Sequence, residues 1–351
     1  MIKSEEISVV LRGAVDETVL MQSLINLKKF LPKAEIIIST WEGTVLPEKS
    51  SGFYDKLILS KDPGAVHNDP ENIRWNMLLR ILKACEAGVE VAERKYVLSM
   101  RSDLLLLKPN FLRYFDKFNK RDKKYSLAKH KILVNSFVTP IYFKEGNVKH
   151  PTPFHISDWW HFGLKEDIKM YYDADKIDDF EEFSRYFETH KRSKDYHMFI
   201  VDHRVWKFSP EQYIGKCFAN KKFKNLDFPD FLSYDNMDLD EALKFTIDNF
   251  IVLDYKQSGF KLMKEPYKSH SNDLSNLLDI QFDGLIRFPV YVRLYRKYFD
   301  KGLHFTIDMP KLKRNKFVKK IFSKDDEFQN GKKRLVITIL GVKFKIRKNN
   351  G

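Results

Sequence analysis

The sequence predicts an α/β fold built on a mostly parallel β-sheet that helices cover on both faces. Short apolar runs alternate with segments of helical periodicity in the order β-α-β-β-α-β. The runs are continuously apolar, as expected for strands that are buried on both sides. With 351 residues, 43% of them apolar, the chain is long enough for one large domain or two and is too apolar to be intrinsically disordered.

The individual elements follow from residue spacing. Buried strands are predicted at residues 7–11, 35–40, 56–60 and 95–100. Helices with apolar residues three and four apart are predicted over 18–31, which Pro32 ends, and over 72–87. Later segments have a weaker pattern. They are an amphipathic helix at 165–172, a helix start at 210–212, an aromatic and basic stretch at 285–299, a β-hairpin at 334–347, and extended segments at 132–143, 158–163 and 248–254.

The net charge of +14 is concentrated at one end of the chain. Residues 311–351 contain 14 Lys and Arg against 3 Asp and Glu, a net charge of +11, which leaves +3 for residues 1–310. A nearly neutral body argues against a nucleic-acid-binding domain. In the basic tail, Phe317 and Ile321 lie among lysines, a pattern typical of segments that bind an anionic membrane surface. A merely solubilising charged tail is the alternative.

The apolar runs and the cysteines indicate the cellular compartment of the protein. No long apolar run follows the N-terminus and none reaches about 18 residues, so we expect neither a signal peptide nor a membrane-spanning helix. Cys85 and Cys217 are far apart in the sequence and fit a reducing compartment. These features fit a cytoplasmic protein whose basic tail can bind a membrane surface.

Several enzyme classes lack their motifs. The chain contains no G-x-G-x-x-G after its first strand, no G-x-x-x-x-G-K-[ST], no G-x-S-x-G and no H-E-x-x-H. Nicotinamide-dependent enzymes, P-loop NTPases, α/β-hydrolases and zinc hydrolases are therefore unsupported.

Two charged residues follow the fourth predicted strand. Arg101 and Asp103 come directly after the apolar run 95–100. Ligands of open α/β sheets bind beyond the carboxyl ends of strands, so both residues fall in the expected crevice. Asp103 could bind Mg²⁺ or Mn²⁺ on a diphosphate, and Arg101 could clamp phosphate directly. A solvated ion pair at a strand end is the alternative.

Several segments, taken in order, resemble the WavE family of lipopolysaccharide-synthesis proteins. They are LRGAV at 11–15, AEIIISTWEG at 34–43, DPG at 62–64, NIR at 72–74, YVLSMRSD at 96–103, HISDWWHFGLKEDI at 155–168 and PEQYI at 210–214. The resemblance implies a GT-A type glycosyltransferase, a hexosyltransferase that uses a nucleotide-sugar donor. Its acceptor would be an oligosaccharide or lipid-linked glycan of lipopolysaccharide, lipooligosaccharide or capsule. The implied location is the bacterial cytoplasm, with the protein peripheral on the inner face of the inner membrane. In this reading Asp103 is the metal ligand for Mn²⁺ or Mg²⁺. Arg101 replaces the first carboxylate of the family's DxD motif, which leaves the use of a metal open.

The resemblance also implies a nucleotide site. Arg12, Gly13, Asp62 and Arg74 would hold the nucleotide together with Arg101. Three of these residues also have a purely structural explanation. Gly13 could be a turn glycine, Asp62 could belong to an Asp-Pro-Gly turn, and Arg74 could be a solvated charge on a helix.

The segment 155–163 has the densest cluster of functional residue types. Trp159, Trp160 and His161 are predicted to bind the acceptor sugar. Strand alternation places Asp158 and Trp160 on one face and Trp159 and His161 on the other, so one Trp is expected to be core. Asp158 or Glu211 would be the general base of an inverting reaction, whereas a retaining reaction needs none. A helix-start role accounts equally well for Glu211.

The predicted organisation has three parts. Residues 1–215 would form the nucleotide-sugar-binding and catalytic domain, 216–310 a helical C-terminal extension packed on it, and 311–351 the basic amphipathic tail. A non-catalytic carbohydrate-binding or assembly protein of surface-polysaccharide synthesis is the main alternative function.

Overall fold

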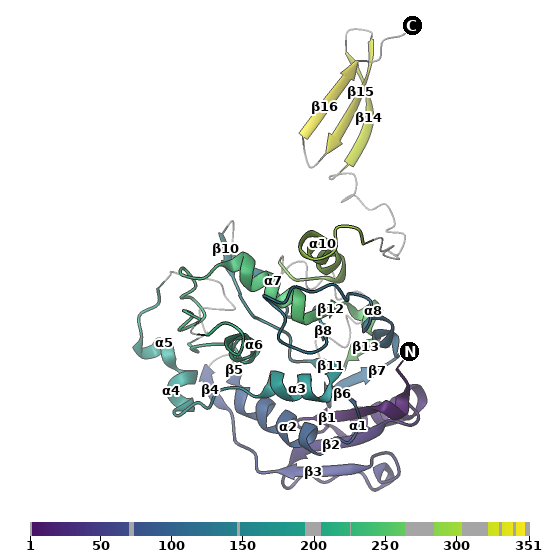
Figure 1. The fold of residues 1–351 in the computed structure, drawn as a ribbon, viewed down its shortest axis with the longest axis vertical. Helices are drawn as coiled ribbons and strands as arrows, with labels where there is room; N and C mark the ends of the chain where they lie inside the picture. Colours follow the sequence, from purple (N-terminus) through teal and green to yellow (C-terminus); the bar gives the residue numbers. More distant parts are fainter. Residues whose placement is uncertain are drawn as a thin grey trace. The chain divides into compact units, whose positions relative to one another are not determined.

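The computed structural model describes two compact units, Met1–Leu303 and His304–Gly351. Its described residues are 2–69, 74–145, 148–193, 205–224, 226–263, 284–303 and three strands between 322 and 347. Those strands form an antiparallel sheet of β14 (Phe322–Gln329), β15 (Lys332–Ile339) and β16 (Val342–Arg347) (Figure 1). The predicted hairpin at 334–347 is confirmed, whereas the basic segment 311–321 lies outside the described residues.

A seven-stranded sheet is the centre of the first unit. Its strand order is β12-β8-β11-β6-β1-β2-β3. Within it β11 alone runs antiparallel to its neighbours, which confirms the predicted mostly parallel α/β fold. The strands are β1 (Ile7–Arg12), β2 (Glu35–Trp41), β3 (Lys56–Ser60), β6 (Tyr96–Arg101), β8 (Ile132–Asn135), β11 (Trp160–Leu164) and β12 (Phe250–Leu253).

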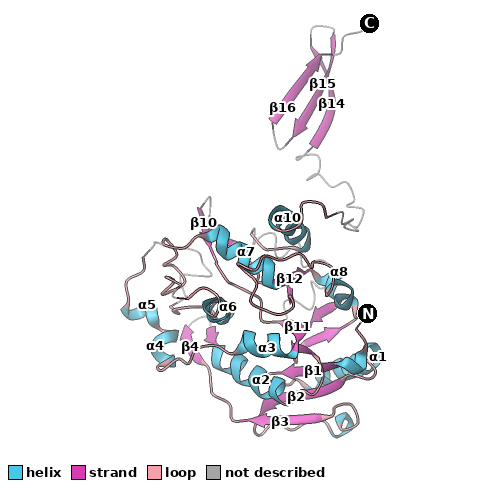
Figure 2. Ribbon diagram, viewed as in Figure 1, coloured by secondary structure: helices cyan, strands magenta, loops and turns pink. Residues whose placement is uncertain are grey.

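Helices flank this sheet (Figure 2). Helix α2 (Leu78–Glu90) packs on β1, β2, β3 and β6 and against α3 (Lys165–Tyr172). Gly88 allows this close approach, since a Cβ there would lie 2.3 Å from a Val10 methyl carbon. Helix α1 (Glu17–Phe30) connects β1 to β2, a step toward the β3 edge of the sheet. Helix α2 lies in the connection from β3 to β6, which steps back toward the β12 edge. Right-handed crossovers therefore place α1 and α2 on opposite faces.

The other elements surround this centre. The helices are α4 (Phe180–Ser184), α5 (Tyr186–Thr189), α6 (Pro210–Asn220), α7 (Leu239–Asn249), α8 (Tyr255–Ser258) and α10 (Phe288–Tyr298), with 3₁₀ turns at Ser4–Glu6, Glu48–Ser50 and Asn110–Tyr114. Three two-stranded sheets pair β4 (Val66–Asp69) with β5 (Arg74–Asn76), β7 (Leu104–Leu106) with β13 (Phe260–Leu262), and β9 (Tyr142–Glu145) with β10 (Val148–Pro151).

Some boundaries differ from the predicted ones because side chains bond backbone groups near the ends of the elements. The helix predicted over 72–87 begins at Leu78, since the buried Asn76 side chain accepts a hydrogen bond from the Leu78 backbone N–H at 3.2 Å. The extended segment 132–143 is broken after β8, where the Thr139 hydroxyl bonds the Asn135 carbonyl at 2.7 Å. The strand predicted over 158–163 begins only at Trp160. The predicted division at residue 215 stays a prediction, although β12 joins the main sheet.

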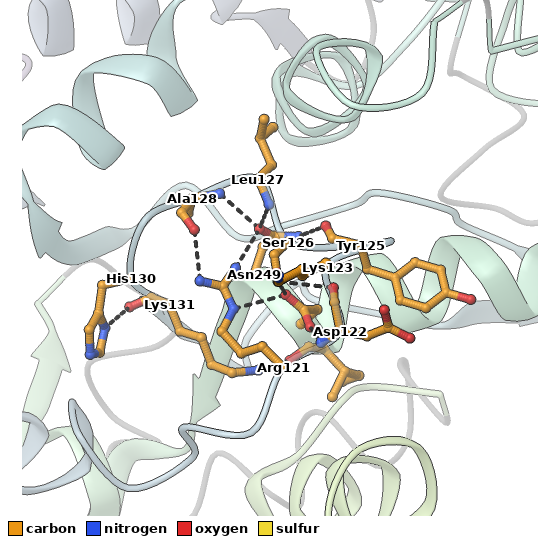
Figure 3. A network of polar contacts seen from close by, with 12 residues as sticks. Arg121, Asp122, Lys123, Tyr125, Ser126, Leu127, Ala128, His130, Lys131 and Asn249 are labelled. Carbon is orange, nitrogen blue, oxygen red and sulfur yellow. Dashed lines mark hydrogen bonds and ion pairs between the residues drawn. The ribbon is translucent and has the colours of Figure 1, made fainter.

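A buried polar network fixes the start of β8 against the end of α7 (Figure 3). The Asn249 side-chain oxygen accepts from the Leu127 and Ala128 backbone N–H groups at 2.8 and 3.0 Å. Asp248 accepts from the Arg121 Nε at 2.9 Å and from the Ser126 hydroxyl at 2.8 Å. Because Asp248 and Asn249 directly precede β12, the network aligns β8 and β12, which are parallel neighbours.

Lys131 is a buried amine beside this network. Its Nζ donates to the Ile247 carbonyl at 2.6 Å and lies 5.0 Å from the centre of the Tyr295 ring. Burial lowers the pKa of Lys131 to about 7, against a smaller opposing effect of Asp248. The ordinary pKa of an unfolded lysine is about 10.4. The unfolded chain therefore binds more protons at this residue between pH 7 and 10, and the free energy of unfolding rises with pH in that window.

We expect Lys131→Met to remove this pH dependence. Between pH 7.5 and 9.5 the wild type should gain about 2 kcal/mol of unfolding free energy relative to the variant. Urea unfolding at both pH values measures the difference. Lys129→Met, at an exposed lysine, is the matched control and should follow the wild type. Parallel behaviour of Lys131→Met and wild type would show that Lys131 is charged in the fold.

Candidate functional site

The carboxyl ends of the parallel strands meet at one edge of the sheet, and the chain order changes direction there. From β1 the chain goes outward through β2 to β3, then returns to β6 on the other side of β1. Such a switch point is where open α/β sheets bind ligands. The residues at the carboxyl ends of β1 and β6 are Arg12 and Arg101, which are register partners. Two guanidinium groups therefore share the switch point.

Arg12 is a buried brace at this edge. Its side chain is 3% exposed, and its Nε donates to the Ser99 hydroxyl at 3.2 Å. Its Nη2 donates to the Asp158 carbonyl, and its Nη1 lies 4.0 Å from the Asp158 carboxylate. Burial disfavours the charge, but Cys85, Tyr172 and Asp158 outweigh it, so the pKa of Arg12 is raised. Arg12 thus ties the end of β1 to the segment that enters β11.

The loop after Arg12 has an open backbone. Gly13 has φ +97°, a conformation that favours glycine, and no heavy atom lies within 4 Å of where its Cβ would be. Its N–H donates to the Ser39 carbonyl at 3.0 Å, and the Ser102 hydroxyl bonds the Ala14 carbonyl. The loop is held at both ends while its outer side can be approached by a flat ligand.

Arg101 is the accessible partner at the switch point. Its Nε and Nη2 donate to the two Asp103 carboxylate oxygens at 2.9 and 2.6 Å, and the two side chains are 29% and 26% exposed. The guanidinium carbon lies 5.9 Å from the centre of the Trp159 ring. Burial opposes the charge of Arg101, yet Asp158 and Asp103 raise its pKa. The fork is therefore a charged, partly exposed group, and another doubly bonding anion could replace Asp103 as its partner.

The aromatic cluster divides between core and site. Trp159 precedes β11 and packs on Phe137, with 4.0 Å between ring centres. Trp160 is fully buried against Phe260 at 4.7 Å. Trp160 is therefore core, as expected of one of the two, but Trp159 is also buried, at 7% exposed. His161 is also fully buried.

His161 belongs to a buried layer behind the site. Its Nδ1 lies 2.6 Å from the Tyr172 hydroxyl, and burial followed by the charge of Arg12 lowers its pKa well below the usual range. Burial raises the pKa of the adjacent Tyr171, and Asp158 and Glu211 raise it further. Tyr171 thus lies within electrostatic range of both predicted base candidates.

The family comparison covers nearly the whole chain. Residues 7–324 match the family described as WavE lipopolysaccharide synthesis. This chain belongs to the WavE family. The predicted resemblance is therefore confirmed for the length of the first unit and into β14. None of the curated proteins matches this WavE chain.

A solved structure of an active-site mutant of LgtC is also similar to this WavE chain. The identity is 12% and the TM-score is 0.29, over 46% of this chain. The match spans 59% of that chain, less than two thirds of its length.

Two other residues predicted to bind the nucleotide, Asp62 and Arg74, do not lie at the ends of β1 or β6, where the switch point is. Asp62 follows the edge strand β3, and its carboxylate accepts from the Arg80 Nε at 2.7 Å and Nη2 at 2.5 Å. Hydrogen bonding from Arg80 lowers the pKa of Asp62. Arg74 lies in β5 rather than on the predicted helix, and its side chain is outside the described residues.

Sequence reasoning missed several polar residues of this WavE chain. Arg80 is on α2 and gave no signal beyond helical spacing. Asn135 ends β8 and Ser136 follows it, and Asp254 and Tyr255 follow β12. The strand-end argument that selected Arg101 applies to Asp254 and Tyr255, at the end of the segment predicted over 248–254, but Asn135 and Ser136 lay inside the extended segment predicted over 132–143.

The donor set at this edge does not suit a resident metal ion. Asp103 is the single predicted carboxylate ligand, and both of its oxygens are bound by Arg101. In the described part of the chain, no group of three or more His, Cys, Asp or Glu side chains is arranged to hold a metal. The predicted Mn²⁺ or Mg²⁺ ligand role of Asp103 stays a prediction. Among the described helices, none has the length and hydropathy to cross a membrane.

Substitution of Arg12 and of Arg101 in the WavE site should lower the free energy of unfolding by different amounts. Arg12→Ala leaves buried polar groups without a partner and should lower the free energy of unfolding by about 3 kcal/mol. Arg101→Ala breaks a partly exposed pair and should cost about 1 kcal/mol or less. Urea unfolding of both variants tests this. Equal losses would contradict the assignment of Arg12 as a structural brace.

Proposed function

We propose that this WavE protein is a GT-A type glycosyltransferase. It would move a sugar from a nucleotide-sugar donor to a lipopolysaccharide, lipooligosaccharide or capsule acceptor. The observation that carries the proposal is the pair Arg12 and Arg101 at the switch point, with the Arg101 fork accessible and the Gly13 backbone open. Family membership supports surface-glycan synthesis as the setting.

The donor would lie across the switch point. Gly13 would approach the nucleoside, and the Arg101 fork would bind the diphosphate. Bidentate binding of a phosphate by a guanidinium is strong and geometrically specific. Phosphate oxygens would then compete with Asp103 for Arg101. When the glycosidic bond to the diphosphate breaks, Arg101 would stabilise the negative charge that develops on the leaving group.

Asp62 and Arg80 would bind the nucleoside part of the donor, away from the diphosphate. They lie beside β3, and their bidentate pair presents a carboxylate and a guanidinium at the carboxyl edge. Such a pair can bond ribose hydroxyls or a base edge. Arg74 stays a proposed diphosphate contact.

The acceptor would approach from the side of β11. In an inverting reaction, Asp158 or Glu211 would remove the proton of the attacking hydroxyl. Asp158 is favoured by its position, because Arg12 fixes its backbone beside Arg101. Glu211 is the second residue of α6, where the Ser209 side chain caps the helix, so a helix-dipole role remains sufficient for it.

The experiment is a screen of UDP-, GDP-, ADP- and CMP-sugars for donor hydrolysis and transfer by the full chain, with and without Mn²⁺. Arg101→Gln should raise the donor KM at least 10-fold, because it replaces a charged fork with a neutral amide. Asp158→Asn or Glu211→Gln should lower kcat about 10²–10⁴-fold if that residue is the base.

Controls separate chemistry from folding. Arg101→Gln and Glu211→Gln change partly exposed side chains and should keep the wild-type urea midpoint. Asp158 is buried, so circular dichroism is used to check that Asp158→Asn remains folded. Lys95→Gln, at the amino end of β6, changes a cation at the opposite edge of the sheet and should leave donor hydrolysis unchanged. If no nucleotide sugar binds or is hydrolysed, the chain is a carbohydrate-binding or assembly protein instead.

The basic tail gives a second proposal, that residues 311–351 hold the protein on an anionic membrane. The net charge of +11 supports it, since each basic residue near such a surface contributes about 1 kcal/mol. Vesicle sedimentation of the full chain and of a chain ending at Pro310 is the test. Binding should require anionic lipid, weaken with salt and disappear on truncation. Equal binding of both chains would refute the role of the tail.

A further inference from the structure

A small pocket lies beyond the carboxyl ends of β8 and β12. Its walls include Asn135, Ser136, Trp159 and Tyr255. The backbone N–H of Ser136 donates to the Leu253 carbonyl at 3.0 Å, so the two strand ends are joined at the base of the pocket. The cavity has a volume of about 40 Å³. Because one water-sized group needs roughly 10–15 Å³, the cavity holds one edge of a small ring and not an oligosaccharide.

Several polar groups of the pocket are available to a ligand. The side-chain oxygen of Asn135 accepts from the Phe137 N–H at 3.2 Å, but its amide nitrogen donates to none of the described residues. The hydroxyls of Ser136 and Tyr255 likewise make no hydrogen bond within the described part of the chain. The polar atoms of these three side chains reach the solvent-accessible part of the pocket, where a polar ligand can bond them.

The remaining walls are aromatic and charged. Trp159, Phe137 and Phe260 form the apolar side. On the other side the Asp254 carboxylate accepts from the Arg287 Nε at 3.1 Å and from the Phe288 N–H at 3.0 Å. Amide, hydroxyl and carboxylate groups that converge opposite aromatic rings match a sugar ring, which has hydroxyls at its rim and apolar C–H faces.

The pocket lies next to the proposed diphosphate site. Trp159 lines the pocket, and the same ring lies 5.9 Å from the Arg101 guanidinium carbon. Leu104 also lines the pocket and follows Asp103 directly, while the Met263 N–H donates to the Asp103 carbonyl at 2.9 Å. A ligand with a diphosphate on Arg101 and a ring beside it can therefore reach both.

We infer that this pocket binds one glycosyl ring, through hydrogen bonds from Asn135, Ser136 and Tyr255 and contact with Trp159. This rests on the proposed function in that the ring belongs either to the nucleotide-sugar donor or to the acceptor. The residues that contact the sugar are then those at the ends of β8 and β12, together with Trp159 of the predicted cluster, whereas Trp160 and His161 are fully buried.

The test uses the double variant Ser136→Ala/Tyr255→Phe in the full chain. Each substitution removes one hydroxyl and leaves the carbon skeleton in place. The control is Ser51→Ala/Tyr54→Phe, the same two changes in the loop before β3, at the opposite edge of the sheet. Saturation-transfer NMR with the methyl glycosides of glucose, galactose, mannose and N-acetylglucosamine measures ring binding. Titration with UDP, GDP, ADP and CMP measures nucleotide binding separately.

At least one methyl glycoside should bind the wild type and the control equally, and the double variant about 5- to 100-fold more weakly, since one neutral hydrogen bond changes affinity roughly 2- to 12-fold. Nucleotide affinity should not change. If the glycoside competes with the matching nucleotide sugar, the ring is the donor's; if both bind together, it is the acceptor's. No glycoside binding, or equal binding by the double variant, overturns the inference. Glycoside binding without any nucleotide binding keeps the pocket and refutes the transferase.

Discussion

The site depends on one buried interaction, the contacts of the Arg12 guanidinium with Asp158. Strand β11 runs against its neighbours, so its beginning, not its end, lies at the functional edge of the sheet. Something must therefore hold the segment that enters β11 in place. Arg12 does so by bonding the Asp158 carbonyl and by facing its carboxylate. The backbone of β6 adds a second tie, since the Arg101 N–H donates to the Trp159 carbonyl at 3.0 Å, and together the two contacts place Asp158 and Trp159 beside Arg101.

The two arginines at the switch point are register partners in β1 and β6, but their surroundings differ. Arg12 is enclosed by Tyr172, Cys85 and Ser99, so its guanidinium interacts only with groups inside the described part of the protein. Arg101 lies at the rim, paired with a carboxylate that is itself partly exposed. A buried charge with several partners organises structure, whereas an exposed fork can exchange its partner. This difference assigns Arg12 to support and Arg101 to ligand binding in the proposed reaction.

Backbone strain is concentrated beside the same segment. Val138 and Phe154 have φ values of 58° and 59°, which are unusual for residues other than glycine and rare for a β-branched one. The ring of His155 joins the two places, with its Nδ1 3.1 Å from the Val138 carbonyl. Phe137, next to Val138, packs on Trp159. Strained residues persist where surrounding packing over-determines them, and here that packing shapes the aromatic wall of the sugar pocket.

The sequence by itself determined the α/β class, the positions of the first strands and of helix α3, and the Arg101 and Asp103 pair, because continuous apolar runs and their ends are local properties. Family membership also followed from motifs in order. Only the tertiary structure decided which charges are buried: Arg12 and Arg101 look alike in sequence, but neighbours from α2, α3 and β11 enclose one of them. The reversal of β11 and the meeting of β8 with β12 are long-range pairings that no local pattern encodes, so the pocket that they form was visible only in the fold.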